Sequence, residues 1–236
     1  MTLFTRRAGC AALLFIAAAL TACGDSEPDQ RKAFIKFLDD INQRVGVHFM
    51  VPTQEDRVAF GDYMKHYQVI LDFNADMKVM SNDYQNAMKG MGPSGPQTLE
   101  QMAARRQDFA KIKDVTSATM HAFETRLAKA NAERAALTQP NDLKAVYNKT
   151  FDKLIAAPVQ AMIASDQALL AYVDRSAQIA DYINQNRGKL TVSGSQMRAS
   201  DAKTLSEINA LIKAHQDAQK RFQDAQRAGD QVVNGR

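Results

Sequence analysis

The 236-residue sequence predicts an all-α protein, an elongated antiparallel helical bundle of long amphipathic helices with coiled-coil-like seams. Three observations lead to this prediction. Apolar residues recur at spacings of three and four along most of the chain. Glycine is absent between Gly61 and Gly90 and again between Gly95 and Gly188, and long glycine-free spans suit helices. Prolines fall where a helix should begin or be interrupted.

Five helices are expected, each with an apolar stripe and a polar outer face. The first covers residues 27–45 and the second covers residues 53–90. The third and fourth cover residues 97–137 and 140–187, and the fifth covers residues 196–228. A helix of about 40 residues is about 60 Å long and seldom persists without a partner, so we expect these helices to pack side by side.

Local patterns define the helix ends. Residues 90–96 are rich in Gly and Pro and predict the turn between the second and third helices. Pro158 lacks an N–H group, so we expect a kink or break in the fourth helix. Residues 189–194 predict a loop, briefly extended, and residues 228–234 predict a frayed polar tail. Three pairs have the spacing of a capping box: Ser26 with Asp29, Thr53 with Asp56, and Thr98 with Gln101.

The first 22 residues have the composition of a secretory signal peptide. Two arginines precede a thirteen-residue apolar run, which is shorter than the roughly 20 residues of a membrane-spanning helix. The run ends in the pattern of a bacterial lipobox, Leu20-Thr21-Ala22-Cys23. We therefore expect residues 1–22 to be removed and the thiol of Cys23 to carry a diacylglycerol. An ordinary cleaved signal peptide and a coincidental apolar segment stay open as alternatives.

Lipidation of Cys23 has consequences for charge and location. Residues 23–236 would form a single helical domain that is anchored to a membrane without spanning it. The net charge falls from +4 to +2 because the two leader arginines leave, which removes the main support for nucleic-acid binding. Cys10 leaves as well, so no disulfide is expected. Gly24 directly after Cys23 favours the outer membrane over the inner membrane, with Asp25 one place later.

His66 and His121 are the strongest candidates for a metal site. They lie at similar distances from Pro93, on opposite arms of the predicted hairpin between the second and third helices. Glu124 shares a helix face with His121. Together the three side chains would form a His/His/Glu set compatible with a divalent metal. The alternative is that both histidines flank a helix seam, where they are hydrogen-bonded or solvated.

Motifs for nucleophilic or zinc-dependent catalysis are absent from the sequence. It contains neither Gly-x-Ser-x-Gly nor His-Glu-x-x-His. No cysteine stays available for catalysis once Cys23 is lipidated. We therefore expect a protein that is not an enzyme and that carries no cofactor beyond the lipid on Cys23.

Three stretches near the start of the predicted domain carry a family resemblance. They are DQRKAFIKFL at 29–38, GVH at 46–48 and FGDYMKHYQVILDF at 60–73. The chain resembles the YiaF-like bacterial lipoprotein family, catalogued as domain of unknown function 3053. The resemblance implies a helical envelope lipoprotein and supplies no catalytic residues.

Five residues of the third stretch mark a candidate functional patch, on the premise that they form a family motif: Phe60, Gly61, Tyr63, His66 and Tyr67. The alternative is that these residues make a tightly packed aromatic contact between the first two helices.

These observations together predict a lipid-anchored bundle in the periplasm that binds or scaffolds another envelope protein. The expected partners are the membrane, through the lipid, and an envelope protein, and nucleic acid is not among them. Two alternatives stay open. One is a metal-binding module that uses His66, His121 and Glu124. The other is a carrier of a small ligand or lipid, which predicts an apolar pocket along the bundle.

Overall fold

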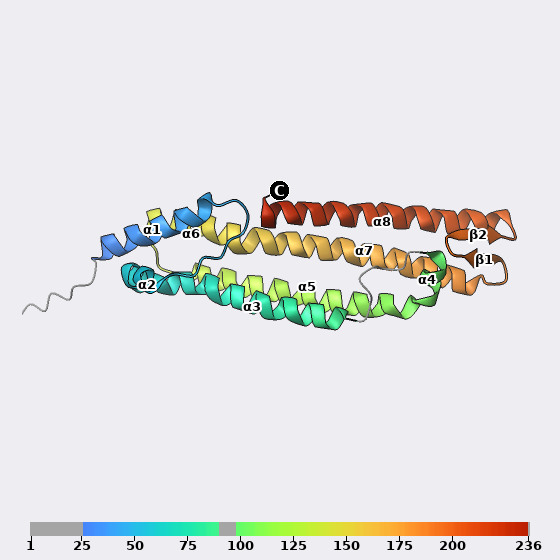
Figure 1. Cartoon of the computed structure of the whole chain (residues 1–236), viewed down its shortest axis with the longest axis horizontal. Helices are drawn as coiled ribbons and strands as arrows, with labels where there is room; N and C mark the ends of the chain where they lie inside the picture. The colour runs from blue at the N-terminus through green and yellow to red at the C-terminus, as the bar shows by residue number, and fades with distance from the viewer. Residues whose placement is uncertain (1–25, 90–97, 236) are drawn as a thin grey trace, which may run out of the picture.

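The computed structural model describes residues 26–89 and 98–235 as an elongated bundle of helices with one small β-hairpin (Figure 1). The predicted fold class is confirmed. Four long helices lie side by side in the order α3, α5, α7 and α8, and α1 packs against α6 and α2 at one end. The predicted leader, Cys23 and the turn at 90–96 lie outside the described residues.

The elements follow one another along the chain with short connections. The first half contains α1 (Glu27–Gln43), α2 (Gln54–Phe60), the 3₁₀ turn η1 (Gly61–Tyr63), α3 (Met64–Met88), α4 (Leu99–Ala104) and α5 (Arg106–Ala135). The second half contains α6 (Asn141–Phe151), the π turn η2 (Asp152–Ala156), α7 (Ala157–Gln185), β1 (Leu190–Ser193), β2 (Gln196–Ala199) and α8 (Ala202–Asn234).

Two of the three predicted capping patterns act as caps. At the start of α2, the Thr53 N–H donates to Asp56 Oδ2 at 2.9 Å, and the Asp56 N–H donates to Thr53 Oγ1 at 3.1 Å. The Thr98 hydroxyl oxygen accepts from the N–H of Gln101 at 3.1 Å. Ser26 makes no such bond to the backbone, and its hydroxyl donates to the carboxylate of Asp29 instead.

Two predicted helices differ from the structure. The third is divided at Arg105, and its first piece, α4, packs against α7. The fifth begins six residues later than expected, at Ala202, because residues 190–199 form the antiparallel hairpin of β1 and β2. Asp201 then begins α8, since its Oδ1 accepts from the N–H of Thr204 at 2.8 Å.

The fourth predicted helix is continuous from Asn141 to Gln185, and Pro158 does not break it. The π turn η2 lies directly before Pro158, and there the N–H of Ala157 donates to the carbonyl of Asp152. Pro158 has no N–H group and cannot donate a backbone hydrogen bond to a carbonyl of the preceding turn. The wider π turn accommodates this missing bond without interrupting the helix. By length and apolarity this run is the one described helix that could span a membrane.

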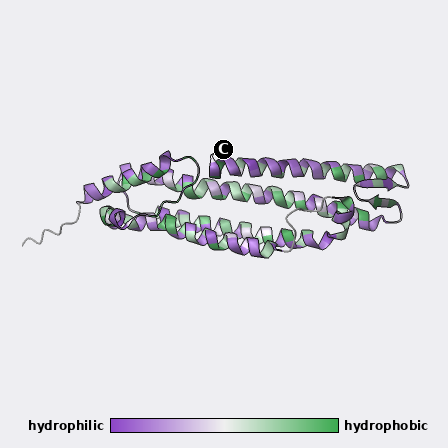
Figure 2. Ribbon diagram, in the orientation of Figure 1, coloured by the Kyte–Doolittle hydropathy of each residue, from purple (hydrophilic) through white to green (hydrophobic). Residues whose placement is uncertain are grey.

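Two separate apolar cores occupy the two ends of the bundle. The first joins α1, α2, α3 and α6 and contains Phe34, Tyr67 and Phe151. The second joins α4, α7, β1 and α8 and contains Ile179 and Ile208. Figure 2 shows α8 as mostly hydrophilic along its visible side, whereas α7 between its neighbours is more apolar.

The C-terminal residues do not fray, so that prediction is wrong. Helix α8 continues to Asn234, and its end docks on the connection between α1 and α2. The N–H of Val47 donates to the carbonyl of Val233 at 2.8 Å. Gly235 has φ +70° and ends the helix in the left-handed conformation, where its N–H donates to the carbonyl of Gln231.

Lys153 links η2 to the end of α1. Its ammonium group donates to the carbonyl oxygens of Ile41 at 3.0 Å and Asn42 at 3.1 Å, and also to that of Arg44. The last carbonyls of a helix lack intrahelical partners, and Lys153 is the donor to those of Asn42 and Arg44, while Ile41 also accepts from the N–H of Arg44 at 3.2 Å.

We expect Lys153→Met to lower the free energy of unfolding by about 1–3 kcal/mol, because it removes the Lys153 donor from the carbonyls of Asn42 and Arg44. Urea denaturation followed by circular dichroism measures the change. Lys149→Met is the matched control, since Lys149 lies on α6 with an exposed side chain. Equal stability of the two variants would contradict this role of Lys153.

Candidate functional site

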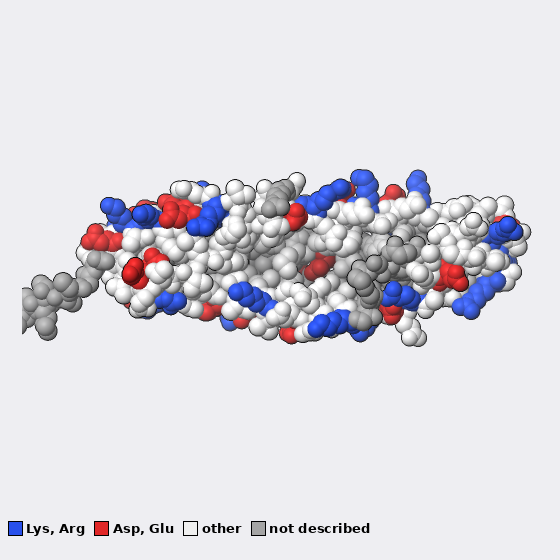
Figure 3. Space-filling view, in the orientation of Figure 1, with Lys and Arg blue, Asp and Glu red and all other residues white. Residues whose placement is uncertain are grey.

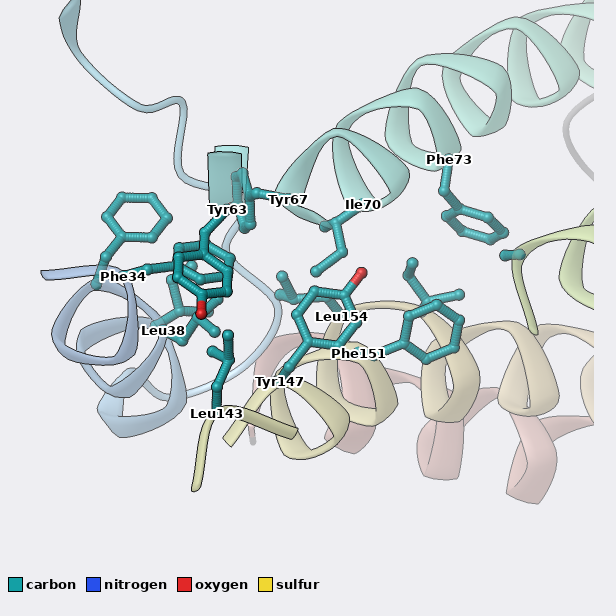
Figure 4. Close-up of a cluster of buried hydrophobic side chains, with 14 of the residues drawn as sticks. Phe34, Leu38, Tyr63, Tyr67, Ile70, Phe73, Leu143, Tyr147, Phe151 and Leu154 are labelled. Atoms are coloured by element: carbon teal, nitrogen blue, oxygen red, sulfur yellow. The ribbon is translucent and has the colours of Figure 1, made fainter. Parts of the chain in front are cut away.

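The aromatic members of the predicted patch lie in the first core. Phe60, Tyr63 and Tyr67 are buried, and Figure 4 shows Tyr63 and Tyr67 beside Phe34 of α1. The ring centroids of Phe34 and Phe60 are 5.2 Å apart, and those of Phe37 and Tyr67 are 5.1 Å apart. Such tilted and edge-on contacts stabilise aromatic clusters. The geometry therefore fits the alternative interpretation, an aromatic contact between the first helices.

Each buried tyrosine hydroxyl in this cluster has a hydrogen-bond acceptor. Tyr67 donates to the carbonyl of Met50 at 2.8 Å, and Tyr147 donates to the carbonyl of His66 at 2.8 Å. Tyr63 donates to the carboxylate of Glu27. Burial, assisted by that carboxylate, raises the pKa of Tyr63 to about 12. These phenols stay neutral near pH 7 and serve as structural donors.

Gly61 occupies a position that other residues do not adopt without strain. It joins α2 to η1 with φ +50°, in the region that favours glycine. A Cβ at this position would lie 2.3 Å from side-chain atoms of Gln30 on α1. Its role is to let the chain turn closely against α1.

His66 lies half-buried at the edge of the same cluster. Its ring centroid is 5.3 Å from that of Tyr63 and 6.4 Å from that of Tyr147. Its Nδ1 is 3.0 Å from Nε2 of Gln139. Burial lowers the pKa of His66, which favours the neutral ring. His66 is therefore engaged with neighbouring side chains of the fold.

The structure does not bring His66 and His121 together, so the predicted metal set is not assembled. The side chain of His121 is 83% exposed, with its Nδ1 4.0 Å from Glu124. Among the residues that the structure describes, no three His, Cys, Asp or Glu side chains form a group that could hold a metal ion.

The pairing of α3 with α5 explains this difference. Asp76 on α3 contacts Arg126 on α5, and His66 contacts Gln139 beyond the end of α5. His66 therefore lies opposite the C-terminal end of α5, well past His121. Similar distances from Pro93 did not give similar heights, because α4 separates from α5 and packs on α7.

Arg126 is a structural residue that the apolar pattern did not reveal. Its side chain is 8% exposed, its Nε donates to Asp76 at 2.6 Å, and an Nη atom lies 3.5 Å from Glu133. Its guanidinium carbon also lies 5.1 Å from the centroid of the Phe73 ring. A buried arginine requires such paired carboxylates, because an unpaired buried charge is costly.

A cavity of about 140 Å³ lies between α3, α5 and α7, at the edge of the first core, to which Phe123 of its wall belongs. Three helices contribute both apolar and hydroxyl-bearing side chains to its wall. The lining residues are Ser81 and Tyr84 from α3, Thr119 and Phe123 from α5, and Met162, Ser165 and Asp166 from α7. An outer groove beside Met77 and Lys78 shares Ser81 and Met162 with this cavity.

Asp166 is the acidic group of the cavity wall. Burial raises the pKa of its carboxyl to about 6. In the sequence, Asp166 is one polar residue within an apolar run, and nothing near it in the chain indicates that it lines a cavity. Its placement in a cavity follows from the lateral packing of α3 and α5 against α7.

Charges of both signs are distributed along the face that Figure 3 shows. Lys and Arg side chains alternate with Asp and Glu over its length, and many form ion pairs, such as Arg106 with Asp181 at 2.6 Å. A nucleic-acid surface is instead typically a concentrated basic patch.

We expect Gly61→Ala to lower the free energy of unfolding by about 1–3 kcal/mol, because alanine is strained at this φ, and the end of the Gln30 side chain must also move to admit its Cβ. Thermal and urea denaturation measure the loss. Gly188→Ala is the control, since a Cβ there meets no atom within 4 Å, and its stability should change by less than about 0.5 kcal/mol. Equal effects of the two substitutions would refute the role of Gly61.

We expect Asp166→Asn to stabilise the protein at pH 7.5 by about 1–3 kcal/mol. The folded chain holds this proton up to about pH 6, and the unfolded chain holds it up to about 3.8. The carboxyl therefore makes the wild type less stable as the pH rises through this window.

The gain from Asp166→Asn should accordingly be smaller at pH 4.5 than at pH 7.5, as measured by urea denaturation at both values. Asp83→Asn is the matched control, because Asp83 is an exposed aspartate on α3. A destabilising effect of Asp166→Asn at pH 7.5 would show that the carboxylate is well solvated.

Comparison with known proteins supports the resemblance seen in the sequence. The chain is 23% identical over 202 residues to the uncharacterized protein YiaF of Escherichia coli K12, with 85% of each chain covered. The same values hold for YiaF of Escherichia coli O157:H7 and of Shigella flexneri. No solved structure matches. Residues 11–229 match the family described as protein of unknown function DUF3053, and the chain therefore belongs to this family.

Proposed function

We propose that this protein is a lipid-anchored lipoprotein of the bacterial cell envelope that acts as a rod-shaped binding or scaffolding protein in the periplasm. The observation that carries the proposal is the position of the lipobox relative to the bundle. The lipobox ends at Cys23, and the first helix of an elongated body begins at Glu27.

The short connection between Cys23 and Glu27 constrains the orientation of the rod. Four residues span at most about 14 Å when fully extended. Helix α1 begins at one end of the bundle, and the β-hairpin lies at the opposite end (Figure 1). A lipid on Cys23 would hold the first end at the membrane surface and present the other end for interaction.

The length of the body supports a spacer or scaffold. The continuous helix from Asn141 to Gln185 has 45 residues. At 1.5 Å per residue it is about 67 Å long. Packing along both cores keeps this helix rigid, so a partner bound at the far end would sit at a defined distance from the membrane.

A non-enzymatic role is supported by the nature of the family-like segment. Phe60, Tyr63 and Tyr67 are used in the first core, and their hydroxyl groups, where present, are bonded within the fold. These residues stabilise the end of the rod nearest to the proposed anchor. A binding surface is then to be sought on the exposed faces of the helices.

We expect Cys23→Ala to release the protein from the membrane into the soluble periplasmic fraction. Alanine has no thiol to carry the lipid, so the variant loses the acyl chains that hold the wild type at the membrane. Cell fractionation and immunoblotting measure the release. Cys10→Ala is the matched control and should leave the protein in the membrane. Membrane retention of the Cys23 variant would refute lipid anchoring.

Two further measurements address location and partner with the wild-type protein. Density-gradient separation of the membranes should place it with the outer membrane, as Gly24 after Cys23 favours. Crosslinking in cells, followed by identification of the captured protein, tests the scaffold. Capture of one envelope protein through the hairpin end supports it, and a protein that captures nothing from either end contradicts it.

A further inference from the structure

The section of α7 between the two cores has apolar surface that the fold leaves incompletely covered. Val159 belongs to the first core and Val173 to the second, and no residue of α7 between them is fully buried. The most apolar 18-residue window of the helix from Asn141 to Gln185 has only 22% of its residues buried. Partly covered apolar surface of this kind often marks a place where a ligand binds.

The cavity between α3, α5 and α7 lies along this section. Phe123 and Met162 form the apolar part of its wall, and the hydroxyl groups of Ser81, Thr119 and Ser165 are in the same wall. An apolar pocket with a few convergent polar groups is the usual arrangement of a small-molecule site. The polar groups fix the orientation of a ligand, and the apolar wall contributes the burial.

Asp166 gives this cavity a chemical preference. Burial is the one influence found on the pKa of its carboxyl, and no described residue donates a hydrogen bond to it or forms an ion pair with it. Tyr84, from the opposite helix α3, is a neutral phenol that interacts electrostatically with it. A partly buried carboxylate without a cationic partner is unfavourable, and a ligand that carries a positive charge would supply that partner.

The size of the cavity limits what that cation can be. Its volume is about 140 Å³. A cavity of about 150 Å³ with apolar walls accommodates benzene. A metal ion would need several ligands, and the described residues form no such group here.

We propose that this cavity binds a small organic ammonium ion, a primary amine carried on an apolar group of about the size of benzene. The ammonium group donates to the carboxylate of Asp166 and to hydroxyl oxygens of the wall, because it has three donors. The apolar group contacts Phe123 and Met162. This proposal is independent of lipid anchoring, since it concerns the middle of the bundle.

The test is calorimetric titration of the full chain, purified in detergent, with benzylamine near pH 7.5. Benzyl alcohol is the neutral probe of nearly the same shape. We expect saturable binding of benzylamine at or below about 10 mM. We expect benzyl alcohol to bind at least about tenfold more weakly, because it lacks the charge.

Variants locate the binding. Asp166→Asn should weaken benzylamine binding at least about tenfold and leave benzyl alcohol unchanged. Ser165→Leu, which fills the cavity, should weaken both probes. Asp83→Asn removes a charge from the exposed face of α3 and should change neither affinity. Thermal melting of each variant shows that it is folded.

Three results would overturn the proposal. The first is no saturable binding of benzylamine in this range. The second is equal affinity of the amine and the alcohol, which would mean that the carboxylate contributes nothing. The third is amine binding that Asp166→Asn leaves unchanged, which would place the ligand elsewhere on the protein.

Discussion

The helical run from Asn141 to Gln185 supplies side chains to both apolar cores, and α5 and α8 pack directly against it. Phe151 and Leu154 from its first part contact the aromatic cluster, and Ile179 and Ile183 from its last part lie in the second core. Continuity through Pro158 is therefore essential to the architecture. The π turn provides it, because its longer hydrogen-bonded ring lets the backbone pass a residue that has no N–H.

The two cores leave a less densely covered section between them. There α7 presents mainly small or unbranched side chains, such as those of Ala161, Met162 and Ser165. Small side chains cannot fill the space between three helices, so a cavity persists beside Asp166. The same feature that lowers local packing also creates the space that we assign to an ammonium ligand. Binding sites often lower the stability of a protein, because the space that admits a ligand is left unfilled in its absence.

The end of the bundle near the proposed anchor is the most aromatic part of the molecule. The ring of Phe34 on α1 contacts those of Tyr63 and Tyr67 at the start of α3. Lys153 donates hydrogen bonds to carbonyl oxygens at the end of α1. The end of α8 adds a hydrogen bond from Val47 to Val233. A lipid on Cys23 would thus be attached to a firmly packed unit, which suits a rod that holds a partner at a fixed distance.

The sequence by itself determined the all-α class, the helix-forming segments and two helix caps, because periodicity, glycine distribution and capping depend on residues close in the chain. It also identified the family, through three stretches between residues 29 and 73. Only the tertiary structure decided the pairing of α3 with α5, which separates His66 from His121, and the docking of α8 on Val47. It also placed Asp166 in a cavity and enclosed Arg126 among carboxylates. These features depend on which faces of distant helices meet, and an amphipathic stripe states only that a helix has an apolar face, not its partner or its height along that partner.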